Sequence, residues 1–319
     1  MVRKLRLDEI QNDLAAVEGI LSSRSPETDP IGHAQFSGRK KLLEQQLEAL
    51  SDTPDNKASV ALMFAGAPVM GARGVKAEFA GKAVDIFQEL VAKQFANNEL
   101  GSIASRGPVP LRANSDLLVT HIARGSVGLI LEEADQNDSL TRSQLSVAVD
   151  KVTQDIAQIT EVNSDGFEAL ITEIDNRYFS SLGSLFRLLD DSGATVRLVE
   201  GDQDLQLDSL AIHRGRERTA SATIEDKDNV RLIGQLYLLP AHRKFELVLP
   251  NSGEIIYGNV SGEFAKQHLE ALTNMGEVIG QEWQVRLRSR TISRPSREPQ
   301  ITYTLLGLVE RVQRPPTLR

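Results

Sequence analysis

The 319-residue sequence contains no cysteine, which excludes disulfide bonds, thiolate metal ligands and a cysteine nucleophile. Aromatic residues are also scarce, at 5% of the chain with one tryptophan. No run approaches the roughly 18 apolar residues that a membrane-spanning helix needs. The first residues, MVRKLRLDEI, meet Asp8 and Glu9 before the apolar core of a secretory signal can form. The sequence therefore predicts a soluble, cytoplasmic protein that has no membrane partner.

Motifs of catalytic and metal sites are missing as well. The turn GAPVMGARG (66–74) is glycine-rich, but it lacks the Gly-Lys-Ser/Thr ending of a phosphate-binding P-loop. The run EVNSDGFEALITE (161–173) is spaced like a calcium loop, yet Thr172 stands where a bidentate glutamate is needed. We therefore expect no cofactor and no metal, and we favour a non-enzymatic protein. The alternative is a nucleotide or small-molecule enzyme with its site near GAPVMGARG or in the loop 97–116.

Residues 1–51 have the pattern of a helical hairpin. Apolar residues recur at spacings of three and four from Leu7 to Leu21 and again from Phe36 to Leu50, on either side of the loop SSRSPETDPIGH. The seam of such a hairpin must be buried, either on the rest of the chain or on a second copy. The sequence does not decide between these two arrangements, and a homo-oligomer is one of the expected assemblies.

Residues 58–222 predict an α+β domain. The apolar run SVALMFAG is short enough for a buried strand, and residues 75–96 carry apolar side chains over a wide arc of a helix. The runs LLVTHIA and VGLILEE flank a glycine-containing turn, as in a strand hairpin. Helices are expected over about 145–159, 167–174 and 179–189, and two short strands, TVRLVEG and DLQLDSL, follow them.

Residues 229–312 change character and predict five strands. The expected strands are 231–239, 244–250, 254–260, 282–292 and 301–309, and a helix GEFAKQHLEALTNM lies between the third and the fourth. This order resembles the OB-fold, a five-stranded barrel that often binds oligonucleotides through its strand 2–3 face and its loops 1–2 and 4–5. The expected fold class is therefore α+β: a helical hairpin, a central α+β domain, a C-terminal OB-like barrel and a tail at 313–319.

Positive charge is gathered in the last part of the chain. The formal net charge is −8, yet residues 229–319 carry 12 Lys and Arg against 8 Asp and Glu, so the rest of the chain is strongly acidic. Five arginines lie in QVRLRSRTISRPSR (284–297). Because side chains alternate between the faces of a strand, Arg286, Arg288 and Arg290 are expected to face water, opposite an apolar core side.

Two loops of the expected barrel extend this stripe. Arg294 and Arg297 lie in the loop between strands four and five, and Arg243 and Lys244 lie in the loop PAHRK between strands one and two. In an OB-fold these loops flank one groove, so we expect a positive funnel for a phosphate backbone. The candidate nucleic-acid-binding residues are Arg243, Lys244, Arg286, Arg288, Arg290, Arg294 and Arg297. The alternative is that the stripe pairs with acidic residues of the same chain or of a protein partner.

The leucine-rich hairpin, the segment ARGSVGLILEE (123–133) and the strand YTLLGL (303–308) together resemble an uncharacterised group of bacterial proteins. Some members of that group belong to mobile or anti-phage defence loci, so the resemblance implies a role in antiviral defence. The function predicted from the residues is a binding and assembly protein that oligomerises through its helices and holds nucleic acid with its barrel. The alternative is an accessory interaction subunit of an effector complex.

Overall fold

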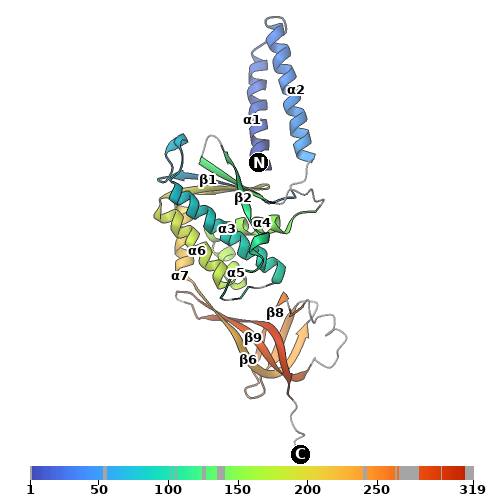
Figure 1. Cartoon of the computed structure of the whole chain (residues 1–319), viewed down its shortest axis with the longest axis vertical. Coiled ribbons are helices and arrows are strands. Elements are labelled where there is room, and N and C mark those ends of the chain that lie inside the picture. The colour runs from blue at the N-terminus through green and yellow to red at the C-terminus, as the bar shows by residue number, and fades with distance from the viewer. Residues whose placement is uncertain are drawn as a thin grey trace, which may run out of the picture.

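The computed structural model places three parts one after another along the long axis of the molecule (Figure 1). It describes residues 2–52, 56–101, 103–104, 106–123, 127–134, 141–239, 243–262, 264–265, 280–295 and 297–312. The parts are a helical hairpin, an α+β domain and a closed five-stranded barrel, so the expected α+β class is confirmed. No helix in these ranges is long and apolar enough to cross a membrane.

The hairpin consists of α1 (Arg3–Ser22) and α2 (Pro30–Asp52). Its seam is buried between the two helices, where Ile10, Val17 and Leu43 are packed by their apolar neighbours. α1 starts on the central sheet, where Val2 packs against Ala61, Ile130 and Val199. Because α1 has 20 residues, the arm is about 30 Å long.

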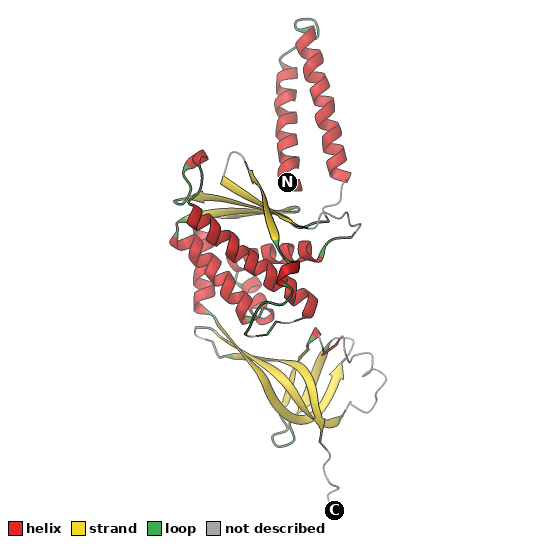
Figure 2. Ribbon diagram, in the orientation of Figure 1, coloured by secondary structure: helices red, strands yellow, loops and turns green. Residues whose placement is uncertain are grey.

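The central sheet is antiparallel, with the strand order β2-β3-β1-β4-β5. Its strands are β1 (Ser59–Gly66), β2 (Leu117–Ala123), β3 (Val127–Glu133), β4 (Ala194–Glu200) and β5 (Gln203–Leu207). Along β1, Val60, Leu62 and Phe64 face the helical core, whereas Ala61 and Met63 face the start of the hairpin. Figure 2 accordingly shows the sheet between the hairpin and a layer of helices.

That helical layer contains α3 (Ala77–Leu100), α4 (Gln144–Thr160), α5 (Asp165–Glu173), α6 (Asn176–Asp191) and α7 (Ser209–Ser221). The first four agree with the apolar periodicity, but α7 is not predicted by it. The sequence of α7, SLAIHRGRERTAS, is mostly polar, and its buried residues are Ile212 and Gly215. Gly215 lies so close to Phe186 that an added Cβ would be 2.6 Å from the ring. A polar helix that touches the core at so few points gives no periodic signal.

The barrel has the strand order β10-β8-β7-β6-β9 and closes on itself. Its strands are β6 (Thr223–Leu239), β7 (Lys244–Val248), β8 (Ile255–Val260), β9 (Gln281–Ser293) and β10 (Gln300–Arg311). β8 and β10 run parallel, and the other pairs are antiparallel. This arrangement is consistent with the OB-like barrel expected from the element order. The helix expected over 262–275 lies outside the described residues except for Gly262, Phe264 and Ala265, and the tail 313–319 lies outside them entirely.

β6 begins at Thr223 rather than at residue 231, where the sequence pattern places it. The added length carries β6 from the central domain into the barrel, where Ile224 pairs with Ile292 of β9. Both isoleucines are buried in the core of the central domain. The barrel is therefore joined to the central domain by shared apolar packing as well as by the chain.

Candidate nucleic-acid interface

The arginines of β9 have the predicted alternation but only part of the predicted exposure. Val285 and Leu287 are fully buried in the barrel, and the arginines are on its outer side. Arg286 is exposed to water. Arg288 is only 7% exposed, and Arg290 is largely covered, because this end of β9 is turned toward the central domain. The expectation that all three face water is wrong for Arg288 and Arg290.

Arg290 joins the barrel to the central domain. Its Nε donates to Oδ1 of Asp226 at 2.8 Å, and its Nη1 donates to the carbonyl of Glu173 at 3.2 Å. Asp226 in turn accepts a hydrogen bond from the backbone N–H of Asn176, the first residue of α6. Arg290 is thereby held by groups on both sides of the domain boundary.

Arg288 is held by a neighbouring carboxylate within the barrel. Its Nε donates to Oδ1 of Asp228 at 2.5 Å. Asp228 lies in a bulge of β6, between the partners of Ser289 and Leu287, and the next residue, Asn229, has a φ of 64°. A bulge changes the direction of the side chains that follow it. Asparagine tolerates this left-handed conformation better than most residues, which makes the bulge possible at this point of β6.

The loop after β9 is bound to α5. Nη1 of Arg294 and Nη1 of Arg297 lie 3.0 and 2.9 Å from Oε2 of Glu168. Together with Arg288 and Arg290, these residues pair with carboxylates of the same chain, which is the alternative that the sequence left open. The described residues therefore do not form the expected single groove between two free basic loops, because the loop of Arg294 and Arg297 is docked on the central domain.

The other three basic residues of the candidate set, Arg243, Lys244 and Arg286, are exposed. Arg243 and Lys244 lie beside the end of β8, where the carbonyl of Arg243 accepts from the backbone N–H of Val260. Arg286 is paired across the strands with Arg231, a residue that the basic stripe in the sequence does not include. Like charges directly opposite one another destabilise a strand pair. In the described part of the chain neither arginine has a carboxylate partner, so the pair favours an external anion.

Along β6, Tyr237 lies between Arg231 and Leu239, the cross-strand partner of Lys244. Outward side chains of β6, β7 and β8 form a cross-strand row of Tyr237, Glu246 and Tyr257, and Tyr257 is 75% exposed. We use the name outer barrel face for this surface. It comprises Arg231, Ile233, Tyr237, Leu239, Arg243, Lys244, Glu246, Ile255, Tyr257 and Arg286.

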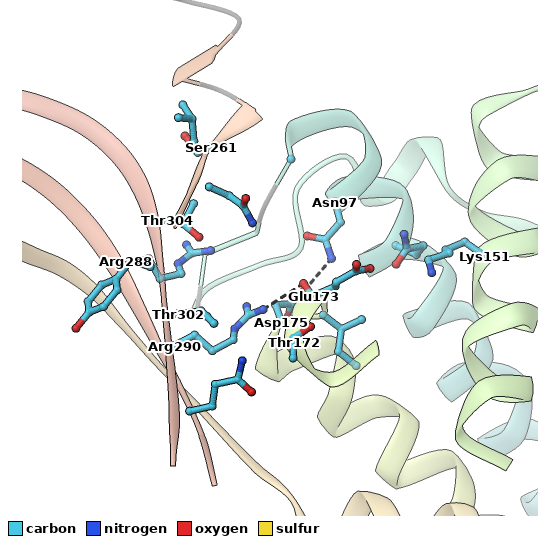
Figure 3. A pocket seen from close by; sticks show the side chains of 17 residues that line it. Asn97, Lys151, Thr172, Glu173, Asp175, Ser261, Arg288, Arg290, Thr302 and Thr304 are labelled. Carbon is cyan, nitrogen blue, oxygen red and sulfur yellow. Dashed lines mark hydrogen bonds between the residues drawn. The ribbon is translucent and has the colours of Figure 1, made fainter. Parts of the chain in front are cut away.

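A cleft of about 600 Å³ separates the barrel from the central domain (Figure 3). Its barrel wall includes Arg288, Arg290 and several hydroxyl and amide side chains. Figure 3 shows the guanidinium groups of Arg288 and Arg290 directed toward the central domain. The opposite wall includes Asn97 and Asp175, joined by a hydrogen bond of 2.7 Å. Asp175 also caps α6, since it accepts from the backbone N–H of Tyr178 at 3.0 Å. The sequence points separately to Arg288, to Arg290 and to the loop 97–116, which contributes Asn97 and Gly101 to the cleft. It does not indicate that they form one site, because the walls come from segments far apart in the chain.

A buried polar cluster adjoins one end of the cleft. Lys151, which lines the cleft, lies 2.8 Å from Oδ1 of Asp155, and Tyr178 donates its hydroxyl to Oδ2 of the same carboxylate at 2.9 Å. Burial raises the pKa of Asp155 in spite of these two partners. Burial and the nearby Asp155 charge raise the pKa of the Tyr178 hydroxyl well above its usual value. The cluster is thus a hydrogen-bonded support for the wall of the cleft.

The turn GAPVMGARG, one of the two alternative site locations suggested by the sequence, borders a smaller cavity of about 340 Å³. Lys76, Lys82 and Glu78 contribute to its lining, and Lys82 is paired with Glu78 at 2.7 Å. Among the residues with described positions, no group of three or more His, Asp or Glu side chains could hold a metal ion.

Comparison of the chain with protein-family models, with curated proteins and with solved structures found no match. The assignment of a function therefore rests on the geometry of the barrel and the cleft.

Proposed function

We propose that this protein is a non-enzymatic binding protein that holds single-stranded nucleic acid on the outer barrel face. The observation that carries the proposal is the cross-strand row of Tyr237 and the exposed Tyr257. Along β6 an exposed basic pair lies on each side of Tyr237: Arg231 with Arg286, and Arg243 with Lys244. Exposed tyrosines offer flat surfaces on which bases stack, and basic side chains at both ends attract phosphates. Glu246 between the tyrosines can accept hydrogen bonds from base amino groups.

The proposal assigns different roles to the seven basic residues predicted from the sequence. Arg243, Lys244 and Arg286 contact nucleic acid, with Arg231 added to them. Arg290, Arg294 and Arg297 hold the barrel against the central domain through Asp226 and Glu168. Arg288 lines the cleft between the barrel and the central domain.

Fluorescence anisotropy with a labelled oligothymidine of about 20 nucleotides tests the proposal over a series of salt concentrations. Each phosphate contact contributes roughly 0.7 to the slope of log K against log salt for a single strand. The double variant Arg231→Gln/Arg286→Gln is therefore expected to bind more weakly and to lower the slope by roughly 1.4. Tyr257→Ala is expected to lose about 1–3 kcal/mol of binding free energy, and to leave the slope unchanged.

The charge-matched control is Arg6→Gln/Arg73→Gln, which removes two exposed arginines from α1 and from the turn before α3. This control is expected to bind as the wild type does. If it weakens binding as much as the barrel variant, net charge rather than the outer barrel face accounts for the affinity. Equal binding by wild type and Tyr257→Ala would exclude stacking at this position.

Self-association through the hairpin is the second part of the proposal. Ile31 and Leu42 on α2 are 73% and 53% exposed, and their spacing of eleven residues puts them on one face, three turns apart. Light scattering should give a multiple of the 35.0 kDa chain mass for the wild type and a lower mass for Ile31→Ser/Leu42→Ser. A monomeric wild type would contradict it.

A protein partner is the second candidate for the outer barrel face. Ile233, Leu239 and Ile255 are exposed there, and apolar side chains gathered on one face are typical of protein interfaces. This candidate predicts a complex that survives nuclease treatment and high salt, whereas nucleic-acid binding weakens as salt rises. The part in anti-phage defence implied by the resemblance stays a prediction.

A further inference from the structure

The cleft between the barrel and the central domain differs from the outer barrel face in shape. Its volume of about 600 Å³ lies within the 300–1,000 Å³ range of small-molecule sites. One side is closed by a backbone contact between Gly101, at the end of α3, and Gly262, after β8: a Cβ added to Gly101 would lie 2.8 Å from Cα of Gly262. Arg290 bridges to the carbonyl of Glu173 elsewhere on the boundary. A cleft bounded in this way suits a small ligand better than a long strand.

Arg288 supplies the cleft with a positioned donor group. Its Nε is fixed by Asp228, and its side chain is buried to more than nine-tenths. Within the described ranges, its Nη1 and Nη2 make no hydrogen bond, and Figure 3 shows the guanidinium directed toward the central domain. A guanidinium that is already oriented by a carboxylate can bind phosphate through two parallel hydrogen bonds with little loss of side-chain freedom.

Hydroxyl and amide groups surround this guanidinium. Thr304 is the cross-strand partner of Arg288 on β10, and Asn259 of β8 is the next residue in the same row. Both line the cleft. They would bind the other oxygens of a phosphate held by Arg288, because hydroxyl and amide N–H groups are hydrogen-bond donors.

The opposite wall supplies hydrogen-bond acceptors. Glu173 lines the cleft, and Asn97 is oriented there by its bond to Asp175. Carboxylate and amide oxygens accept hydrogen bonds from hydroxyl groups. The carboxylates of Glu173 and Asp175 would repel a second phosphate because they are negatively charged, and the lysine that lines this wall, Lys151, is paired with Asp155. The two walls thus match a ligand that has a phosphate at one end and hydroxyl groups at the other.

We propose that this cleft binds a small phosphorylated sugar, either free or as part of a mononucleotide. The phosphate is held by Arg288, Thr304 and Asn259, and the sugar hydroxyls are held by Glu173 and Asn97. Because the ligand contacts both the barrel and the central domain, its binding stabilises their arrangement. This site shares no residue with the outer barrel face, although Asn259 of the cleft is the cross-strand partner of Lys244 on that face, and neither proposal depends on the other.

Isothermal titration calorimetry of the full chain with ribose 5-phosphate, adenosine 5′-monophosphate, adenosine and inorganic phosphate tests the proposal. The two phosphorylated sugars are expected to bind, and adenosine and inorganic phosphate are each expected to bind at least tenfold more weakly. A preference for adenosine 5′-monophosphate over ribose 5-phosphate would identify the nucleotide as the source of the sugar phosphate, and the reverse would identify the free sugar. Binding of adenosine or of inorganic phosphate alone as tight as that of the phosphorylated sugars would overturn the proposal, as would the absence of binding by all four probes.

Thr304→Val keeps the size of the side chain and removes one hydrogen bond to the phosphate, which predicts a loss of roughly tenfold or more in affinity. Arg288→Gln is expected to lose more, but it also leaves Asp228 without its arginine, so Thr304→Val is the decisive variant. Tyr257→Ala is the control, and it should bind ribose 5-phosphate as the wild type does. Unchanged affinity in Thr304→Val would overturn the proposal. Oligonucleotide binding should be unaffected by Thr304→Val, so failure of one proposal is distinguishable from failure of the other.

Discussion

Arg290 of β9 and Asp226 of β6 are cross-strand partners joined by two hydrogen bonds, Nε to Oδ1 at 2.8 Å and Nη2 to Oδ2 at 3.2 Å. The side chains are 12% and 5% exposed. Arg290 also donates to Glu173, and Asp226 accepts from Asn176, and both of these groups belong to the central domain. One ion pair therefore fixes two barrel strands to each other and to the neighbouring domain. Part of the basic stripe thus serves to join the two domains.

Replacement of Arg290 by methionine should destabilise the fold strongly. It leaves the carboxylate of Asp226 buried without its partner, and breaking a buried pair in this way costs about 3–5 kcal/mol. The loss is measurable by urea unfolding, followed through the fluorescence of Trp283, the single tryptophan. The double variant Arg290→Met/Asp226→Leu removes both charges and should recover most of the loss. A single-variant cost below about 1 kcal/mol would mean that the pair behaves as an exposed one.

Gly258 is required for closure of the barrel between β8 and β10. A Cβ at this position would lie 2.0 Å from the carbonyl oxygen of Tyr303, its partner in the parallel pair. Backbone cannot move aside as a flexible side chain can, so Gly258→Ala should cost about 1–3 kcal/mol or more of unfolding free energy. The control is Gly38→Ala on α2, where no atom lies within 4 Å of the added Cβ. That change should stabilise the protein by up to about 1 kcal/mol, because alanine is the better helix former.

The contribution of Asp155 to the stability of the fold should decrease as pH rises. Burial raises its pKa above the ordinary value of 3.8, so the folded protein holds a proton on this carboxyl more tightly than the unfolded chain does. The contribution of Asp155 to stability is therefore lost as pH rises through the folded pKa. Asp155→Asn stays neutral and can still accept the hydrogen bond of Tyr178. Its stability relative to wild type should increase as pH rises above the ordinary Asp pKa of 3.8 and through the raised pKa of Asp155 in the folded protein.

Glu78→Gln provides a comparison of opposite sign. The ion pair with Lys82 lowers the pKa of Glu78, so the contribution of Glu78 is present above its ordinary pKa of 4.5 and is lost as pH falls. Glu78→Gln should therefore lose stability relative to wild type as pH rises. Urea unfolding of the three proteins at several pH values measures both trends. Parallel curves for Asp155→Asn and wild type would contradict the raised pKa of Asp155.

The elements with a strong periodic pattern could be predicted from the sequence. Alternation in β9 predicts the buried Val285 and Leu287 correctly, because it depends only on the geometry of one strand. The burial of Arg288 and Arg290 could not be predicted, because it depends on which side of the barrel meets the central domain. Asp226 and Asp228 are 64 and 60 residues away from their arginines in the sequence, and nothing local indicates either pair.

Other parts of the candidate sites also depend on contacts between residues that are far apart in the sequence, so the sequence pattern does not identify them. Arg231 is isolated in the sequence and becomes part of a basic pair only because β6 lies beside β9. The cleft combines Asn97 of α3, Glu173 of α5 and Thr304 of β10, which no short motif connects. Strand alternation does indicate that Tyr237 and Tyr257 share the outer side of the barrel, once the strands are aligned.

Removal of the Glu168 charge should release the loop between β9 and β10. Both Arg294 and Arg297 depend on Oε2 of Glu168, and Nε of Arg294 is buried without a hydrogen-bond partner within the described part of the structure. Glu168→Gln leaves two neighbouring arginines without their shared carboxylate. The change should cost only about 1 kcal/mol of global stability, since Arg297 is largely exposed and an exposed pair contributes little.

Glu168→Gln should change the local opening of the loop between β9 and β10 more than it changes the unfolding free energy of the whole protein. Trypsin cleavage after Arg297 should become faster under native conditions, because local opening of the loop no longer has to break the two ion pairs. Glu161→Gln, which removes an exposed carboxylate just after α4, is the matched control and should be cleaved as slowly as the wild type. Equal cleavage rates for wild type and Glu168→Gln would mean that Glu168 does not hold the loop. The docking of the barrel would then depend on Arg290 and on the apolar contact of Ile224 and Ile292.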